Sequence, residues 1–306
     1  MKGGLRIAGF CIACLVLFSL YLLEAHIQDL CNQYRAGAYL IDWLDRNGAD
    51  SSPAYTETTP GDKVIVMAKL EEEHAEWVEE ELPDWQRAIY IVNPSHETRR
   101  NTSTLTTPLN KGHESMAYLT YIIDHYHNLP STIAFLHAHR AGFLMAWHVD
   151  APLHDNVMAM RNLQLEFVQQ NGYVNLRCNW NPGCKGPPRF NGHVTEQVWM
   201  EIFDGTSTPP LNISSPTEQE FAGQTYLRKP AEIGAACCAQ FAVSRDQIRK
   251  RPLDDYLKFR QWIYNTELND ASSGRVMEFL WHIIFGMQGV YCPDEQLCYC
   301  QVYGKC

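Results

Sequence analysis

The sequence predicts a three-layer α/β fold, in which helices cover both faces of a parallel β-sheet and the second half of the domain is mostly helical. Two features of the sequence support this prediction: short, continuous apolar runs and the helical segments that separate them. Continuous apolar runs are typical of strands that are buried on both faces. Because strands and helices alternate over about 75 residues, we expect the strands to pair in parallel.

The expected elements follow in order along the chain. The first half contains strand Lys63–Lys69, helix His74–Leu82, strand Arg87–Asn93, helix His113–Tyr126 and strand Ser131–His137. The second half contains helices Asn156–Gln170, Pro252–Glu267 and Ser272–Phe285, with short strands at Gly172–Leu176 and Ala239–Val243. No internal repeat is visible, so we expect residues 63–306 to form a single α/β domain.

An apolar segment precedes this domain. Ile7–Leu23 contains 17 residues without a charge, which is near the lower limit for crossing a bilayer. Basic residues precede it and acidic residues follow it, which favours an uncleaved anchor over residues 1–23 with its N-terminus in the cytosol. The alternative is a cleaved signal peptide. Residues 24–62 are expected to form a helical stem and then a linker at Asn47–Asp62.

The eleven cysteines bear on the compartment of the domain. Cys178 and Cys184 bracket the short loop CNWNPGC, which a disulfide would suit. Four more cysteines crowd the C-terminal tail, at a density typical of a cross-linked element in an oxidising compartment: Cys292, Cys298, Cys300 and Cys306. The alternative is reduced cytosolic thiols, and the tail spacing matches no closed zinc site.

Two glycosylation sequons and the overall charge also bear on the compartment and the partners. The sequons begin at Asn101 and Asn212, in Ser/Thr/Pro-rich stretches that are typical of exposed loops, and they favour a lumenal domain. The net charge of −10 argues against a surface devoted to nucleic-acid phosphates. A local basic run at Ser244–Arg251 is the exception.

A polar cluster is expected where the third strand ends. Parallel sheets bind ligands beyond the carboxyl ends of their strands, and His137 ends this strand. His139 points the same way as His137, and Arg140 would suit a carboxylate or phosphate group. The segment Trp147–Asp150 returns soon afterwards, so His148 and Asp150 are further candidates. The alternatives are a metal cluster and a loop that is merely held by hydrogen bonds.

Carboxylates in the second half are further candidates. Arg275, Glu278 and His282 fall on one stripe of a predicted helix, as either a site or a structural ion-pair network. Asp254 and Asp255 occupy the first turn of another helix, where the helix dipole alone would explain them. There is no P-loop, dinucleotide fingerprint, Gly-x-Ser-x-Gly elbow or Asp-x-Asp pair. We therefore expect neither a cofactor nor a metal.

Several blocks of sequence together resemble a large, mostly fungal family long described as a domain of unknown function. The blocks are NKGHESMAYLTYIIDHYHNLPSTIAFLHAHR, WHVD, GYVNLRCNWNPGC, CCAQFAVSRDQIRKRP and SSGRVMEFLWHIIFG, and the similarity runs from about Lys63 to Cys306. Members of the family include the arginine-containing cyclodipeptide synthases. The resemblance implies an enzyme that condenses arginyl-tRNA with a second aminoacyl-tRNA into a diketopiperazine, without a cofactor.

The resemblance also implies roles for particular residues. Asp254 and Asp255 match the first half of an Asp-Asp-x-x-Glu motif, although Lys258 replaces its Glu. Carboxylates, including Glu278, would bind the guanidinium beside Arg275 and His282. A His or carboxylate would deprotonate the amine, and His139 or Arg140 would stabilise the oxyanion. The tRNA acceptor stem would bind Arg245, Arg249, Lys250 and Arg251.

Two other functions remain open, because aminoacyl-tRNA is cytosolic whereas the anchor, sequons and cysteines point to the secretory lumen. One alternative is a lumenal type II membrane enzyme that resembles glycosyltransferases, since the order of strands and helices suits a glycosyltransferase-A-like core as well as a Rossmann-like core. The other alternative is a membrane-tethered binding domain with structural histidines. The sequence therefore predicts a single-pass membrane protein, with a lumenal domain by the charge rule and a cytosolic one if it is tRNA-dependent.

Overall fold

The computed structural model describes residues 2–46, 60–185, 192–206, 218–221, 224–227 and 229–306. By its internal contacts, the chain divides into two compact units, Met1–Asp50 and Ser51–Cys306. Most of the linker predicted at Asn47–Asp62 lies outside the described residues, as does the sequon residue Asn212.

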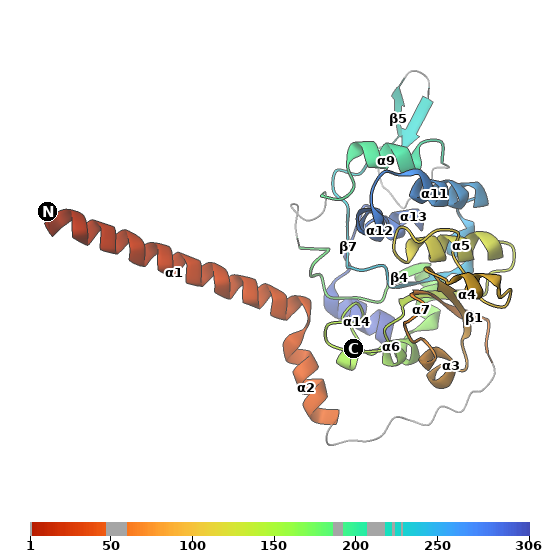
Figure 1. Cartoon of the computed structure of the whole chain (residues 1–306), viewed down its shortest axis with the longest axis horizontal. Coiled ribbons are helices and arrows are strands. Elements are labelled where there is room, and N and C mark those ends of the chain that lie inside the picture. Colours follow the sequence, from red (N-terminus) through yellow and green to blue (C-terminus); the bar gives the residue numbers. More distant parts are fainter. Residues whose placement is uncertain (1, 47–59, 186–191, 207–217, 222–223, 228) are drawn as a thin grey trace. The chain divides into compact units, whose positions relative to one another are not determined.

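The described part of the first unit, residues 2–46, contains two helices, α1 (Lys2–Gln33) and α2 (Ala36–Arg46) (Figure 1). The helices are separated at Tyr34 and Arg35, where Arg35 adopts a left-handed φ of 48°. Within α1, the 24 residues Phe10–Gln33 form a candidate membrane span, whose most apolar 18-residue window has a mean hydropathy of 2.1. Such a stretch is about 36 Å long, enough to cross the hydrocarbon core of a bilayer. The predicted anchor is therefore confirmed as a helix of suitable length and composition.

The second unit is built on a five-stranded sheet in the order β2-β1-β3-β8-β4. Its strands are β1 (Lys63–Lys69), β2 (Gln86–Ile91), β3 (Thr132–His137), β4 (Tyr173–Asn175) and β8 (Phe241–Ser244). The first three strands pair in parallel, whereas β8 runs antiparallel to both β3 and β4. The predicted α/β fold is confirmed, with the correction that one inner strand is antiparallel. Doubly wound dinucleotide-binding sheets are mostly parallel, so β8 distinguishes this sheet from them.

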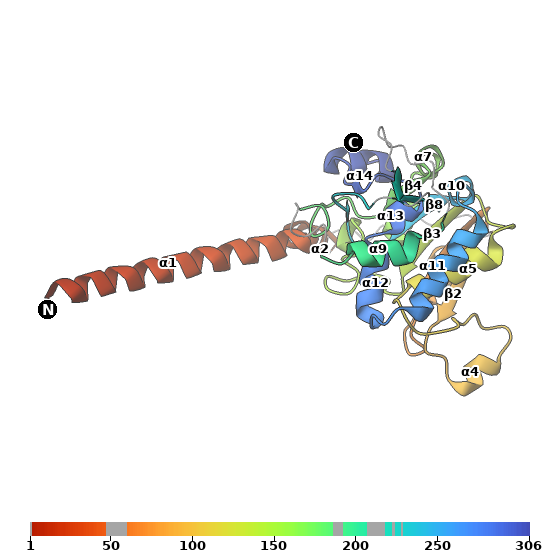
Figure 2. The same ribbon diagram turned by 90° about the horizontal axis from the view of Figure 1, so that it is seen from above.

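Helices cover both faces of the sheet and make the three predicted layers (Figures 1 and 2). Along β1, Val64 and Val66 enter one core, while Ile65 and Met67 enter the other. This alternation follows from the two-residue period of a strand and explains why the run is apolar throughout. The first core is covered by α5 (Ser115–His125), α9 (Glu196–Phe203), α11 (Leu253–Asn265), α12 (Asp270–Glu278) and α13 (Trp281–Ile284). The second is covered by α3 (Trp77–Glu81), α6 (Asn156–Asn162), α7 (Leu165–Asn171) and α14 (Glu295–Tyr303).

Two predicted helices are each divided in the structure. The helix expected at Asn156–Gln170 becomes α6 and α7, because the Gln164 N–H leaves the helical ladder and donates to the Val302 carbonyl at 2.9 Å. The helix expected at Ser272–Phe285 becomes α12 and α13, where the Leu280 N–H donates to the Met277 carbonyl in a tighter turn. The remaining elements are α4 (His96–Arg100), α10 (Arg245–Arg249), a 3₁₀ turn at Pro152–His154, and the strand pairs Glu218–Phe221 with Gln224–Leu227 and Gly234–Ala235 with Val290–Tyr291.

Disulfides join the loop after β4 to the C-terminal segment. Cys178 pairs with Cys298, and Cys184 pairs with Cys292. The predicted bridge within the CNWNPGC loop is therefore wrong, because the C-terminal segment and α14 lie against this loop and provide both partners. The other two bridges are Cys300–Cys306 and Cys237–Cys238. The bridges Cys178–Cys298 and Cys184–Cys292 close loops of 120 and 108 residues. Because they reduce the entropy of the unfolded chain, each would stabilise the fold by about 4–5 kcal/mol.

Candidate functional site

The order of the strands reverses between β1 and β3. The chain passes from β1 to β2 on one side and then returns to β3 on the other side of β1. Ligands of open α/β sheets bind at such a reversal, beyond the carboxyl ends of the strands. A pocket of about 560 Å³ lies there, a size typical of small-molecule sites. Its lining includes Lys69 at the end of β1 and Glu73 after it, His137 at the end of β3 and His139 after it, His113 and Glu114 before α5, and also His148 and Asp270.

The start of α5 reaches this edge because the helix connects β2 back to the beginning of β3. Gly112 and His113 both adopt left-handed φ values, 76° and 50°, and the resulting turn carries Glu114 into the pocket. Gly274 of α12 is packed against the His113 ring, so closely that a Cβ at this position would collide with it. This glycine therefore lets α12 approach the pocket and bring Asp270 beside His113.

The centre of the pocket holds Glu114, His137 and His148. His137 Nε2 lies 3.9 Å from Glu114 Oε2, and His137 Nδ1 lies 3.1 Å from His148 Nδ1. The His137 backbone N–H donates to Gln240 Oε1 at 2.6 Å, which fixes the end of the strand. Among the described residues His137 Nε2 has no hydrogen-bond partner, although its side chain is only 21% exposed. This nitrogen is thus a buried polar atom with which a ligand could form a hydrogen bond.

Burial keeps the central groups uncharged near neutral pH. It raises the pKa of Glu114 to about 8, with further contributions from the carboxylates of Glu278 and Asp270. Burial lowers the pKa of His137 to about 4 and that of His148 to about 2, and neighbouring cationic groups add to both shifts. A protonated carboxyl therefore lies beside a neutral imidazole, which is an arrangement suited to acid–base chemistry.

Two more histidine–carboxylate pairs lie nearer the solvent. His139 Nε2 is 3.7 Å from Glu73 Oε1, and His113 Nε2 is 3.8 Å from Asp270 Oδ2. The Lys69 ammonium also lies at the pocket, but it donates to backbone carbonyls, including that of Leu70 at 3.0 Å. The lining is therefore rich in carboxylates and imidazoles, which offer hydrogen-bond acceptors to a polar or cationic ligand.

Arg140 has a structural role instead of the predicted one. Its guanidinium donates to Glu81 at two positions and to Asp155 Oδ2 at 3.1 Å. Asp155 also caps α6 by accepting the Val157 N–H at 2.8 Å. Arg140 therefore joins the end of β3 to α3 and α6, and its donors are already engaged by two carboxylates.

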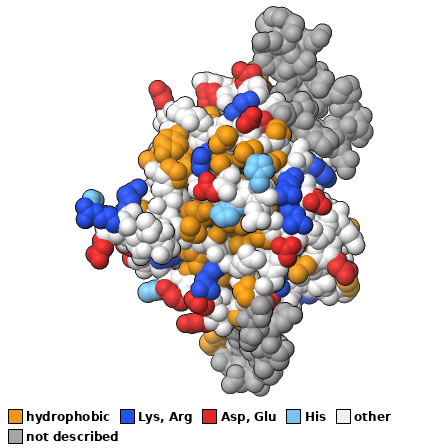
Figure 3. Space-filling view, turned by 90° about the vertical axis from the view of Figure 1, so that its right-hand side faces the viewer, with side chains coloured by type: hydrophobic (Ala, Val, Ile, Leu, Met, Phe, Trp, Pro, Cys, Tyr) orange, Lys and Arg blue, Asp and Glu red, His pale blue; other side chains and the backbone are white. Residues whose placement is uncertain are grey.

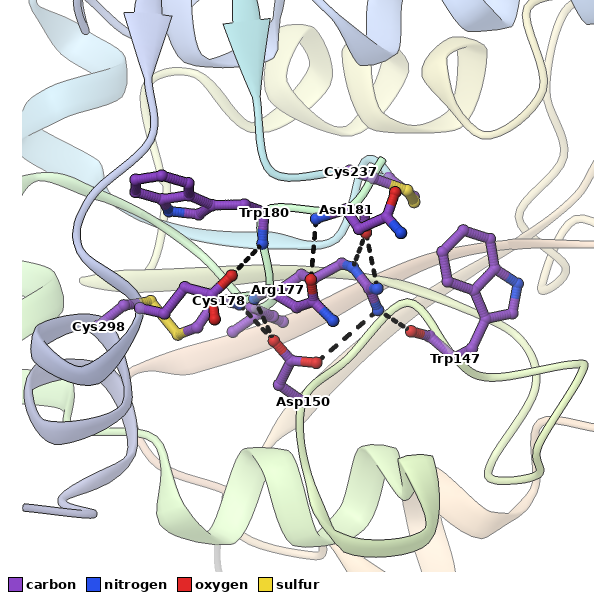
Figure 4. A network of polar contacts seen from close by, with 12 residues as sticks. Trp147, Asp150, Arg177, Cys178, Trp180, Asn181, Cys237 and Cys298 are labelled. Atoms are coloured by element: carbon purple, nitrogen blue, oxygen red, sulfur yellow. Dashed lines mark hydrogen bonds and ion pairs between the residues drawn. A yellow bond between two sulfur atoms is a disulfide. The ribbon is translucent and has the colours of Figure 1, made fainter. Parts of the chain in front are cut away.

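Asp150 also holds the scaffold rather than lining the pocket (Figure 4). Its carboxylate accepts the N–H groups of Cys178 and Asn179, both at 2.6 Å, and lies 3.7 Å from the Arg177 guanidinium. Arg177 in turn donates to the carbonyls of Trp147 and Asn181. Both partners of the ion pair are fully buried. The network fixes the loop after β4 to the segment that carries His148.

The predicted stripe of Arg275, Glu278 and His282 is divided between two helices, with an ion pair in α12 and a buried histidine in α13. Arg275 and Glu278 form an ion pair at 3.0 Å, and burial raises the pKa of Glu278. His282 is fully buried in α13, and its Nε2 contacts the Gly289 carbonyl at 2.9 Å. Within the described residues, Glu278 forms a potential metal-ligand group with Cys237 and Cys238, all three donor atoms lying within 4.8 Å of one another. The two sulfurs are joined in the structure, so they do not offer free thiolates.

Asp254, Asp255 and the basic run predicted to bind tRNA lie at the opposite edge of the sheet, because β8 runs antiparallel and carries the chain away from the pocket. Asp255 forms a buried ion pair with Arg251 at 2.8 Å, while Asp254 is exposed. The expectation that this pair would border the same pocket is wrong. The basic run instead forms hydrogen bonds with nearby segments. Arg245 donates to the Leu129 carbonyl, and Arg249 donates to the carbonyls of Tyr126 and His127. Lys250 donates to Gln247. On the face in Figure 3, acidic and basic side chains are interspersed.

Of the predicted site residues, the structure brings His137, His139 and His148 together at one pocket. The sequence prediction missed Glu114, Glu73, Asp270 and the role of His113. One signal could have found Glu114: a helix that leads into a parallel strand begins at the carboxyl edge of the sheet, so its first residues face the site.

Fold and site together define an α/β domain with a histidine–carboxylate pocket at the edge of its sheet, in a chain that also carries a helix able to span a membrane. Residues 65–301 match the family model described as Protein of unknown function (DUF3431), and the chain belongs to this family. No curated protein and no solved structure matches the chain.

Proposed function

We propose that the chain is a single-pass membrane enzyme whose domain works in the secretory lumen and transfers a glycosyl group to a hydroxyl acceptor. One observation carries the proposal: His137 Nε2, which has no hydrogen-bond partner in the described part of the chain, lies 3.9 Å from a protonated Glu114, inside the pocket at the reversal of strand order. Such pairs of groups, with pKa values moved apart by their surroundings, are typical of acid–base sites.

The disulfides support the lumenal location. Cys178–Cys298 and Cys184–Cys292 join segments more than 100 residues apart, and bridges of this kind persist in oxidising compartments. Lys2 and Arg6 precede the uncharged run Ile7–Leu23, and Glu24 and Asp29 follow it, which favours the same orientation. Asn101 is exposed at the end of α4, where a glycan could be attached.

The pocket can supply the proton transfer that glycosyl transfer requires. In the proposed step, an acceptor hydroxyl gives its proton to His137 Nε2, and its oxygen forms a bond to the anomeric carbon of the donor. The bond from that carbon to the leaving group breaks, and the leaving group departs with the electron pair. The Glu114 carboxyl donates a hydrogen bond within the same space, and the carboxylates of Glu73 and Asp270 accept hydrogen bonds from sugar hydroxyls.

A second candidate is the arginine-containing cyclodipeptide synthase activity that the family resemblance implies. The observation that favours it is the excess of carboxylates in the pocket, because a guanidinium binds carboxylates well. The arginine side chain would then meet Glu73 and Asp270 instead of Asp255, which is already paired with Arg251. Such an enzyme would use aminoacyl-tRNA and would therefore need a cytosolic domain.

The test is a transfer assay with the purified full chain, a panel of labelled sugar nucleotides and mixed glycan acceptors. We expect a labelled product from the wild type, and a loss of rate of about 10²–10⁴-fold in His137→Ala. Glu114→Gln should also lose rate. His96→Ala and Glu97→Gln change the same residue types on exposed α4 and should keep full activity. Full activity of both site variants would contradict the proposal, as would a new arginine diketopiperazine in cells that express the chain.

A further inference from the structure

The short helix α2 has a large apolar surface that is open to solvent. Leu40, Ile41, Trp43 and Leu44 are 54%, 60%, 51% and 56% exposed. At 100° per residue they share one side of the helix with Tyr39, and Asp42 and Asp45 lie on the other side. A helix divided in this way normally covers its apolar side, because exposed leucines and a tryptophan are costly to hydrate.

The neighbour along the chain indicates what covers this side. The candidate membrane span ends at Gln33, and α2 begins three residues later, at Ala36. If α1 crosses a bilayer, α2 therefore starts at the membrane surface. Tyr34, Tyr39 and Trp43 lie in this segment, and tyrosine and tryptophan are enriched at the boundary between lipid and water. The break at Arg35 lets α2 leave the direction of α1 (Figure 1).

We propose that α2 is an interfacial helix that lies along the lumenal leaflet, with Leu40, Trp43 and Leu44 in the lipid. The charges that flank the span indicate which leaflet, because Lys2 and Arg6 precede its uncharged run and Glu24 and Asp29 follow it, which places α2 on the lumenal side. Helices that bind anionic membranes carry basic residues on the polar side, and the anionic lipids are concentrated in the cytosolic leaflet. The charged residues of α2 are Asp42, Asp45 and Arg46, so the helix has no basic excess and fits the uncharged headgroups of the lumenal leaflet. The inference goes beyond the proposed function, because it needs the membrane span but no activity.

The test uses a photoreactive amino acid in the full chain, in microsomes, at position 44 or at the neighbouring position 45. We expect a lipid adduct at position 44, on the apolar side, and its loss at position 45, on the acidic side. Position 20 in α1 serves as the control for the span. An adduct at position 44 with the folded domain or with a second copy, in place of lipid, would overturn the inference, and so would equal lipid labelling at 44 and 45.

Reconstitution tests the preference of α2 for uncharged headgroups. In vesicles of phosphatidylcholine, position 44 should form the lipid adduct, and replacing part of this lipid by phosphatidylserine should lower its yield. A higher yield with phosphatidylserine would contradict the assignment to the uncharged leaflet. Absence of lipid labelling at position 20 would show that α1 does not span, and the inference would then fail while the transfer assay still tests the site independently.

Discussion

His137 and Glu114 are more deeply buried than the outer histidines of the pocket, His113 and His139. His113 is 50% exposed and His139 is 35% exposed, whereas Glu114 is only 15% exposed. Removing a group from water disfavours its charged form, so burial raises the pKa of the carboxyl and lowers that of the imidazole. The two groups remain uncharged together between roughly pH 4 and pH 8.

Glu114→Gln should stabilise the fold at high pH. Below the ordinary pKa of 4.5 the carboxyl is protonated in both the folded and the unfolded chain. Between that value and about 8 the unfolded chain releases the proton while the folded chain keeps it, so the free energy of unfolding falls as pH rises. Gln removes this loss. We expect the variant to gain at least about 1.4 kcal/mol over the wild type between pH 5 and pH 8, which corresponds to one pKa unit.

Urea unfolding at several pH values would measure the gain. Glu97→Gln, on the exposed surface of α4, is the matched control and should follow the wild type throughout. A Glu114→Gln curve parallel to that of the wild type would mean that the carboxyl is ionised in the folded chain near neutral pH.

The sequence predicted the histidines of the site but not their carboxylate partners. His137 and His139 could be placed because they follow directly from the end of a recognisable buried strand. Arg140 and Asp150 follow the same strand, yet both are engaged in the scaffold by residues from other elements: Glu81, Asp155 and Arg177. A pattern along one strand does not show which residues distant in sequence will neutralise a charge, so site and scaffold residues could not be separated.

At the scale of the elements, the direction of β8 decides which residues reach the pocket. The strand is four residues long and fully buried, so its composition indicates a strand but not its direction. Because β8 runs antiparallel to β3, Gln240 meets His137 at the pocket edge, whereas Arg245–Arg251 lie at the other edge. The long apolar and amphipathic segments were predictable from the spacing of their apolar residues. The breaks between α6 and α7 and between α12 and α13 were not, because they depend on tertiary contacts and tighter turns.

Asp150→Asn should lower the free energy of unfolding, because Asp150 and Arg177 hold the loop after β4 to the segment that carries His148. The substitution removes the charge that balances a fully buried Arg177, and loss of one partner of a buried pair costs about 3–5 kcal/mol. Glu79→Gln is the control, because Glu79 pairs with Arg87 at 2.7 Å on the exposed surface, where such a pair contributes about 0–1 kcal/mol. Urea unfolding compares the two, and equal small losses would contradict a structural role for Asp150.

At the scale of the whole molecule, each unit has a feature that bears on the proposed location of the domain. The first unit supplies a helix that can cross a membrane, and the second is cross-linked by disulfides that an oxidising environment would preserve. The net charge of −10 and the engaged basic run give no support to a tRNA-binding surface. The side of the membrane on which the domain folds therefore separates the two candidate functions.

The glycosylation state of Asn101 tests the lumenal location most directly. The full chain would be expressed in eukaryotic cells with Asn212→Gln, so that any glycan reports on Asn101 alone. We expect an endoglycosidase-sensitive shift in mobility that Asn101→Gln abolishes, together with a domain that intact microsomes protect from added protease. An unglycosylated domain that the protease digests from the cytosolic side would contradict the lumenal enzyme and favour the tRNA-dependent synthase.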